Sequence, residues 1–191
     1  MAVPESGVSN LEMFELSEFQ EAAGASACMH AVQALASTVC PLGNRGGVLA
    51  IVNPTSGHKK GMEIFKRTAP LFRLAGVNLT SVFTRYGGHA RDIIKGNTAA
   101  DPPILPLDVE QFPTLVIIGG DGTVCEVLNA LMERPDWRSV VRFLRVGTIP
   151  AGSECALGKM IGFINPLAAA YVLLKGHQVT YKTVKSRFWH I

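Results

Sequence analysis

The stretch 114–131 places one carboxylate inside a glycine-rich turn, between an apolar run and a helical pattern. Residues 115–118 form a short apolar run of the type expected for a buried parallel strand. After the turn 119–123, apolar residues recur three and four positions apart, which predicts a helix: Val124, Val127, Leu128 and Leu131. Glycines let the backbone approach a ligand, and the first N–H groups of a helix attract anions. Because a carboxylate repels phosphate, Asp121 indicates a different role, which could be proton abstraction, a metal contact or a hydrogen bond to a hydroxyl.

The same turn is also compatible with a purely structural role. A Gly-Gly-Asp-Gly sequence can connect a strand to a helix, with Asp121 as the capping residue. Three further predicted strands help to decide between a ligand-binding and a structural role, because each ends in a polar, glycine-containing turn. The strands are predicted at 47–52, 77–84 and 145–149, and their turns at 53–57, 84–88 and 150–153. In an open α/β sheet the carboxyl ends of the strands face the ligand site. We therefore expect these turns to converge on one phosphate-rich ligand.

The charged residues around the second turn leave alternatives open. Arg85 and Arg91 could hold phosphate or pair with acidic side chains. His89 stands near a predicted helix start, where a lone histidine is more often structural than catalytic and could cap or orient the loop. The turn 53–61 has neither the spacing of a P-loop nor that of a dinucleotide-binding motif.

Length and composition describe a globular chain of one domain, or of one domain and part of another. The 191 residues are 48% hydrophobic and 17% charged. Their apolar runs are shorter than the ~18–20 residues that span a bilayer, and residues 1–20 lack the basic residues of a signal sequence. The cysteines are scattered, which favours neither a zinc site nor a disulfide framework: Cys28, Cys40, Cys125 and Cys155. A reducing, cytoplasmic compartment is the expectation.

Charge is distributed unevenly along the chain. Residues 1–40 carry five glutamates and no lysine or arginine, so the rest carries all 18 basic side chains but only 10 of the 15 acidic ones. Such a basic body suggests anionic partners, either nucleotide phosphates or an anionic membrane surface. The basic residues are spread out and are not interleaved with aromatic residues, so nucleic acid is not an expected partner.

The chain divides into three parts by composition. Residues 1–45 have some helical periodicity and are expected to be a weakly ordered lead, loosely docked or disordered rather than a partner-binding helix. Residues 46–177 hold the strands and turns, a proline-rich surface loop at 96–113, and helical patterns at 62–74, 89–94, 154–161 and 167–174. Within residues 178–191, the stretch 179–189 alternates apolar and polar side chains imperfectly, which predicts an antiparallel strand with one wet face.

The motifs together resemble those of the diacylglycerol kinase catalytic family of lipid kinases. NAD kinases and phosphofructokinases have a related glycine-rich turn. Residues 119–123 match the Gly-Gly-Asp-Gly-Thr turn, residues 53–57 the N-P-x-S-G motif and residues 84–90 the T-x-x-x-x-H-A motif. Residues 128–137 and 149–153 are more narrowly similar to sphingosine kinases. The resemblance implies an α/β fold with a three-layer open, mostly parallel sheet, and it makes residues 178–191 the first strand of a further β-rich domain.

The resemblance also implies an activity: transfer of the ATP γ-phosphoryl group, with Mg²⁺, to the primary hydroxyl of a lipid such as a sphingoid base. Such an enzyme would be cytoplasmic and peripheral at membranes. Asp121 matches the proposed general base, and no residue is expected as a dedicated metal ligand. The positions that match nucleotide-binding residues are Asn53, Pro54, Thr55, Ser56, Gly57, Thr84, Arg85, Gly88, Gly119, Gly120, Gly122, Thr123, Glu126, Gly152, Ser153 and Glu154.

The chain departs from the family pattern in two ways. Glu154-Cys155 replaces the Gly-Asn that follows Pro-Ala-Gly-Ser in sphingosine kinases. A carboxylate ~4 Å from a phosphate charge costs about 4 kcal/mol at an effective dielectric constant near 20, unless Lys159 or Mg²⁺ offsets it. The chain also ends where the family's lipid-binding β domain is expected to begin, which suggests a truncated or incomplete member. The alternatives are therefore a catalytically incomplete nucleotide-binding fragment, a ceramide or diacylglycerol kinase, and an NAD-kinase-like enzyme. The motifs at 53–57 and 149–153 argue against the NAD-kinase-like enzyme.

Overall fold

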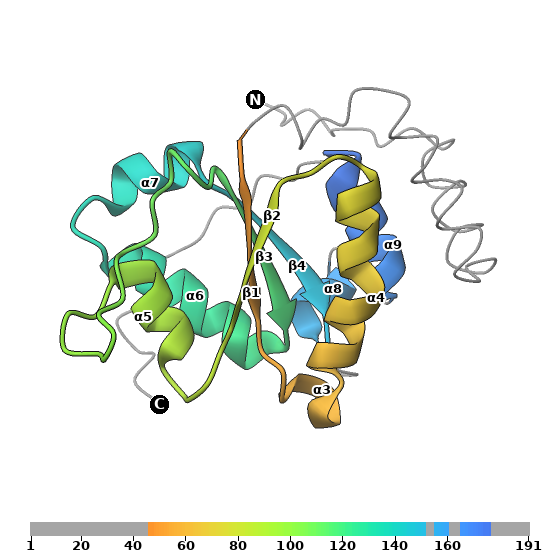
Figure 1. The fold of residues 1–191 in the computed structure, drawn as a ribbon, viewed down its shortest axis with the longest axis horizontal. Coiled ribbons are helices and arrows are strands. Elements are labelled where there is room, and N and C mark those ends of the chain that lie inside the picture. Colours follow the sequence, from red (N-terminus) through yellow and green to blue (C-terminus); the bar gives the residue numbers. More distant parts are fainter. Residues whose placement is uncertain (1–45, 152–154, 161–164, 177–191) are drawn as a thin grey trace, which may run out of the picture.

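The computed structural model describes residues 46–151, 155–160 and 165–176, which form a three-layer α/β fold around one parallel sheet (Figure 1). The sheet has four strands in the order β2-β1-β3-β4. Their bounds are β1 Val48–Val52, β2 Leu79–Phe83, β3 Thr114–Gly119 and β4 Arg145–Pro150. The expected fold class is confirmed, and each predicted strand within the described residues is present. The expected lead at 1–45 and strand at 178–191 lie outside the described residues, so the predicted domain limits stay predictions.

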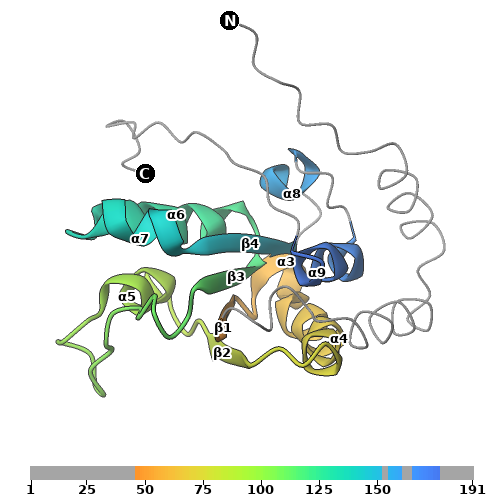
Figure 2. The same ribbon diagram turned by 90° about the horizontal axis from the view of Figure 1, so that it is seen from above.

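Helices cover both faces of the sheet, as the view from above shows (Figure 2). One face carries α4 (Gly61–Leu74) and α9 (Pro166–Leu174), with the short α3 (Ser56–Lys59) at its edge. The other face carries α5 (His89–Lys95), α6 (Asp121–Glu133) and α7 (Trp137–Phe143). The short α8 (Ala156–Met160) follows β4. The sequence pattern predicted α4, α5, α6, α8 and α9, although not all of their limits.

The central strands are buried on both faces, which explains why they are continuous apolar runs rather than alternating ones. All residues of β1 and β3 are buried. Along β1, Val48, Ala50 and Val52 pack into the core under α4 and α9, whereas Leu49 and Ile51 pack into the core under α5 and α6. On β4, Gly147 lets α9 approach closely, since a Cβ there would lie 2.4 Å from the Leu173 side chain.

Two features differ from the sequence-based expectations. The segment 132–137 contains the helix exit that Pro135 predicts, since α6 ends at Glu133, but the chain turns for only three residues and then resumes as α7, which was not predicted. The proline-rich loop 96–113 is irregular as expected, apart from an isolated bridge between Asn97 and Ile104, but it does not lie wholly on the surface. Leu107 is 5% exposed and belongs to the core under α5 and α6, so this loop covers part of the sheet. No helix among the described residues is long and apolar enough to cross a membrane.

Candidate active site

The carboxyl ends of all four strands lie along one edge of the sheet. The register pairs Val52 with both Phe83 and Ile118, and Gly119 with Pro150. The turns at 53–57, 84–88 and 119–123, and the start of the turn at 150–153, therefore lie next to one another, as the sequence analysis expected. Gly152, Ser153 and Glu154 lie outside the described residues, so the expectations for them stay predictions.

Asn53 ties the first turn to the glycine-rich turn. Its Nδ2 donates to Thr123 Oγ1 (2.9 Å), while its Oδ1 accepts from the Thr55 N–H (3.1 Å) and the Thr55 hydroxyl (2.8 Å). Nearby, the Gly120 N–H donates to Ser56 Oγ (3.3 Å). Two residues of the first turn thus hold two residues of a turn that is more than 60 positions away in the sequence, and this fixes the relative position of the two turns.

The backbone that follows the first turn is tightly constrained. A Cβ at Gly61 would lie 2.0 Å from the Asn53 carbonyl oxygen, so only glycine allows α4 to begin this close to β1. Three consecutive residues between them have positive φ: 58° at Gly57, 59° at His58 and 69° at Lys59. Left-handed backbone costs roughly 1–2 kcal/mol for a residue other than glycine. Strain of this kind gathers at ligand-binding turns, where the surrounding contacts maintain it.

His89 orients the second turn. Its Nδ1 accepts the Arg85 N–H (3.0 Å), and its ring stacks on Tyr86 with ring centres 4.6 Å apart. The Tyr86 hydroxyl donates to Asp92 (2.6 Å). Burial lowers the pKa of His89, and the charge of Arg85 lowers it further, which favours the neutral ring that this acceptor role requires. The structural role expected for His89 is therefore what the geometry shows.

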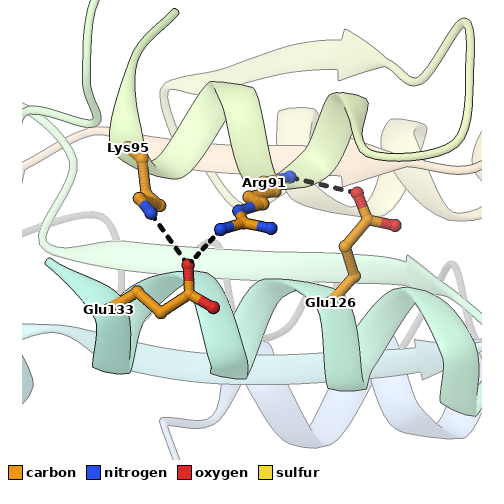
Figure 3. A network of polar contacts seen from close by, with 4 residues as sticks. All are labelled: Arg91, Lys95, Glu126 and Glu133. Atoms are coloured by element: carbon orange, nitrogen blue, oxygen red, sulfur yellow. Dashed lines mark hydrogen bonds and ion pairs between the residues drawn. The ribbon is translucent and has the colours of Figure 1, made fainter. Parts of the chain in front are cut away.

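Glu126 and Glu133, both on α6, hold α5 in place (Figure 3). Glu126 Oε1 accepts the Arg91 N–H at the start of α5 (3.1 Å). Glu133 Oε2 accepts from Arg91 Nη2 (2.6 Å) and from Lys95 Nζ (2.8 Å), and the hydrogen bond from Lys95 is the main cause that lowers the pKa of Glu133. Of the two roles considered for Arg91, the structure shows pairing with an acid. Since α5 carries the second turn at its start, these contacts also set the position of that turn.

Asp121 begins α6 and reaches across to α8. The N-cap of α6 is Gly120 and receives no side-chain cap, so Asp121 does not cap its own helix. Instead, Asp121 Oδ2 accepts the N–H of Ala156, the first residue of α8 (2.8 Å). The buried Cys155 lies beside it: burial raises the pKa of the Cys155 thiol, and the Asp121 carboxylate raises it further. The carboxylate is therefore held in a defined orientation between the third and fourth strand ends.

A cavity of about 230 Å³ lies where the turns meet. It is lined by Asn53, Thr55, Thr84, Arg85, Tyr86, Gly87, Thr123 and Glu126. Six of these were expected to bind nucleotide, while Tyr86 and Gly87 were missed, although they stand inside the predicted turn 84–88. Other expected residues belong to the same turns without lining the cavity: Pro54, Ser56, Gly57, Gly88, Gly119, Gly120, Asp121 and Gly122. Binding by any of them stays a prediction.

A larger groove of about 1010 Å³ also borders the turn 84–88. It lies between β2, α5 and the loop 96–113, and it shares Arg85 and Tyr86 with the cavity. Its lining includes Asp92, Asp101 and Asp108. Because these three carboxylates disfavour phosphate more than the single Glu126 of the smaller cavity, the smaller cavity is the better candidate for an anionic ligand.

The cavity and the turn beside it fit part of a nucleoside triphosphate. No heavy atom lies within 4 Å of a Cβ built on Gly120 or Gly122, so the backbone of this turn is open to a ligand. Pockets for whole small molecules measure ~300–1,000 Å³, so a cavity of about 230 Å³ accommodates only part of the nucleotide. Among the described residues, no group of three or more His, Cys, Asp or Glu side chains could hold a metal ion.

A parallel sheet of this topology, with glycine-rich turns and one held carboxylate at the carboxyl ends of its strands, defines an α/β domain whose candidate ligand site lies at those strand ends. Residues 47–186 match the family model of the diacylglycerol kinase catalytic domain, and the chain belongs to that family. The resemblance found in the motifs is thereby confirmed. The family accounts for most of the chain, including the whole of the described sheet.

Similar proteins point in the same direction. The chain is 38% identical over 113 residues to sphingosine kinase 2 of Arabidopsis thaliana, covering 59% of this chain and 21% of that protein. It is 33% identical over 134 residues to sphingoid long-chain bases kinase 1 of the same plant, covering 68% and 16%. It is 32% identical over 111 residues to human sphingosine kinase 1, covering 58% and 26%. The matched region therefore spans about a quarter of these relatives or less.

The fold is also found in solved structures. A diacylglycerol kinase from Bacillus anthracis superposes with a TM-score of 0.52 at 24% sequence identity. The superposition covers 69% of this chain and 40% of the bacterial one. This likeness establishes the fold of the described domain.

Proposed function

We propose that this chain is the nucleotide-binding part of a lipid kinase that transfers the γ-phosphoryl group of ATP to the primary hydroxyl of a sphingoid base. The observation that carries the proposal is the meeting of three turns, from β1, β2 and β3, around one cavity, with Asp121 in the glycine-rich turn two residues before Thr123, which lines the cavity. The similarity to sphingosine kinases supports the choice of a lipid as acceptor.

The turns would hold ATP through its phosphates. Thr55, Thr84 and Arg85, which carry hydroxyl and guanidinium groups, line the cavity, and the open backbone at Gly120 and Gly122 lies at the start of α6. These are the donors that phosphate oxygens accept from, and the helix start adds a favourable dipole. Mg²⁺ would arrive with the nucleotide and neutralise charge on its phosphates during transfer.

Asp121 would receive the proton of the lipid hydroxyl. Phosphoryl transfer requires little covalent help from the protein, so positioning and charge stabilisation dominate, and the base mainly orients the nucleophile. The bond from the Ala156 N–H fixes the orientation of the carboxylate before any substrate binds. The oxygen–hydrogen bond of the lipid breaks as its oxygen attacks the γ-phosphorus, and ADP leaves with the bridging oxygen.

The finer assignments belong to the same proposal. A sphingoid base is favoured over ceramide or diacylglycerol because the relatives described above are sphingosine and sphingoid-base kinases. The basic excess after residue 40 supports contact with an anionic membrane, and a cytoplasmic location at the membrane surface is part of the same proposal. A second candidate is a nucleotide-binding chain without turnover, because the matched region spans only 16–26% of the relatives' length.

Phosphoryl transfer from labelled ATP by this chain, offered sphingosine, ceramide and diacylglycerol in separate reactions, tests the proposal. We expect phosphorylation of sphingosine that Asp121→Asn abolishes. Calorimetric titration of ATP into the same protein separates the two candidates. ATP binding without transfer to any lipid would support the nucleotide-binding chain, and absence of ATP binding by folded protein would overturn both candidates.

A further inference from the structure

The α7 helix and the start of β4 present a surface that combines arginines with exposed apolar side chains. We call this the α7 surface, and it consists of Arg138, Val141, Arg142, Phe143 and Val146. Phe143 is 67% exposed, Val141 45% and Val146 42%. Arg138, Val141 and Arg142 are spaced as neighbours on one side of α7. Exposed apolar side chains gathered among cations indicate an interaction surface.

The arginines of this surface have no carboxylate close by in sequence or in ion pairs. Residues 137–150 contain no Asp or Glu. The two acidic residues just before α7 are already engaged, Glu133 by Arg91 and Lys95, and Asp136 by Arg134. Among the described residues, the ion pairs involve neither Arg138 nor Arg142. The surface is therefore suited to an acidic partner with apolar side chains.

The same chain carries such a partner in its lead. Residues 11–21 hold four of the five glutamates of residues 1–40, at Glu12, Glu15, Glu18 and Glu21. They are interleaved with large apolar residues: Leu11, Met13, Phe14, Leu16 and Phe19. This composition complements the α7 surface in both charge and apolar character.

The lead enters the described body next to the α7 surface. The Gly47 N–H donates to the Gln111 carbonyl (3.1 Å), and a Cβ at Gly46 would lie 3.0 Å from the Pro113 ring. On the other side of Pro113, the Arg145 N–H donates to the Pro113 carbonyl (3.0 Å). The entry point and the first residue of β4 thus flank the same residue, about two strand spacings or roughly 10 Å apart. Figure 1 shows the starts of β1 and β4 at the same end of the sheet as α7.

We propose that residues 11–21 bind the α7 surface within the same molecule, with their glutamates on Arg138 and Arg142 and their apolar residues against Val141 and Phe143. The segment 22–45 between them has a root-mean-square reach of roughly 25–30 Å when treated as a flexible chain, which is enough to span the distance. A tether of this length gives a millimolar effective concentration, at which individually weak surface pairs are occupied. The contact lies at the end of the sheet opposite the nucleotide cavity, so it is independent of the proposed function.

Protection of the lead from an endoproteinase that cleaves after glutamate tests the proposal on the full 191-residue chain. In the wild-type chain, cleavage after Glu12, Glu15, Glu18 and Glu21, followed by mass spectrometry, is expected to be slow. The double variant R138E/R142E is expected to raise that rate about tenfold, the change that ~1.4 kcal/mol produces. Raising salt from about 0.1 to about 1 M is expected to accelerate cleavage of the wild type only, because the screening length falls from about 10 to about 3 Å.

The matched control reverses two exposed arginines of α4, Arg67 and Arg73, and is expected to leave the rate within twofold of the wild type. A charge-swapped chain, with R138E/R142E and E15R/E18R together, is expected to restore protection at Glu12 and Glu21. Slow cleavage after Glu63 in α4 shows for each variant that the body is folded. Equal cleavage in all variants would overturn the proposal, as would a loss of protection in the α4 control alone. A second assay measures co-sedimentation with vesicles of phosphatidylcholine and phosphatidylserine. If R138E/R142E weakens co-sedimentation but leaves the cleavage rate of residues 11–21 unchanged, the α7 surface binds membrane and the proposal is wrong.

Discussion

Asn53 shows at the scale of one residue how stability and ligand binding are joined in this site. Its amide group donates to the Thr123 hydroxyl and accepts from Thr55, and it also lines the cavity. An aspartate at this position would keep the acceptor for Thr55, and the Thr123 hydroxyl can turn to donate instead of accept. The contacts between the turns would survive this change, whereas the cavity would gain a negative charge.

We therefore expect Asn53→Asp and Asn53→Ala to separate the two roles. Asn53→Asp should keep the free energy of unfolding within about 1 kcal/mol of wild type, but weaken ATP binding at least tenfold, because a charge near phosphate costs more than ~1.4 kcal/mol. Asn53→Ala should lose about 1–3 kcal/mol of stability because it leaves polar groups unpaired. Urea unfolding and calorimetric titration measure the two quantities. Equal ATP affinity of Asn53→Asp and wild type would remove the cavity from the nucleotide site.

His89 makes the position of the second turn sensitive to pH. Its pKa is lowered in the folded protein by burial and by Arg85, so the unfolded chain binds this proton more readily. The free energy of unfolding is therefore expected to fall as pH decreases below the ordinary value of about 6.5 and through the lowered folded pKa. His89→Gln keeps an acceptor for the Arg85 N–H but does not titrate, so it should lose this component of the pH dependence. Denaturant titrations between about pH 7.5 and pH 5 make the comparison, and identical slopes for both proteins would contradict it.

At the scale of elements, Arg134 joins the ends of two helices to the proline-rich loop. It follows α6, its side chain is 11% exposed, and its Nη1 donates to the carbonyls of Ile94 at the end of α5 (2.7 Å) and Leu107 in the loop (3.1 Å). Asp136 holds the guanidinium from the other side with two bonds of 2.8 Å. One guanidinium thus donates hydrogen bonds to two carbonyl groups, that of Ile94 near the end of α5 and that of Leu107 in the loop 96–113.

Removing this guanidinium should destabilise the domain without touching the cavity. Arg134→Ala is expected to cost about 2–3 kcal/mol in the free energy of unfolding, the range for hydrogen bonds to charged groups. Arg134→Lys should recover less than half of that, because an ammonium cannot reproduce the planar fork. The exposed Arg67→Ala on α4 serves as the control, expected within about 0.5 kcal/mol of wild type. If Arg134→Ala protein remained folded but lost ATP affinity, the hydrogen bonds of Arg134 would also affect the nucleotide cavity, contrary to this prediction.

Elements with a strong apolar pattern were predictable from sequence, and contacts between distant residues were not. β1 and β3 are buried on both faces, so their runs of Val, Ile and Leu indicated both the strands and their ends, and hence the place of the turns. Pro135 correctly marked the end of α6, but a proline does not indicate whether a helix resumes, and α7 was missed. The capping of α5 by Glu126 and of α8 by Asp121 each joins residues 35 positions apart, and no local pattern carries that information. Tyr86 could have been found, since it stood inside a predicted turn.

At the scale of the whole molecule, the cavity depends on three strands being assembled at once. Its lining comes from the turns after β1 and β2 and from the start of α6 after β3, and these turns hold one another through Asn53 and Glu126. No such cavity exists in the unfolded chain, so a ligand that binds there stabilises the native state by mass action. Stabilisation by the ligand therefore reports on the site even if no lipid is phosphorylated.

Mg·ATP at about 100 times its dissociation constant is expected to stabilise the chain by about 2.7 kcal/mol, which raises the Tm by roughly 5–10 °C for a chain of this size. Adenosine at the same concentration should produce a much smaller rise, because the cavity offers Thr55, Thr84 and Arg85 to phosphates. Asp121→Asn should keep the shift, since its proposed role is to accept a proton, whereas Asn53→Asp should lose most of it. Scanning calorimetry of the three proteins with each ligand measures these shifts. If adenosine and ATP stabilised the wild type equally, the turns would not bind the phosphates. The proposed contact between the ATP phosphates and the glycine-rich turn 119–123 would then be wrong.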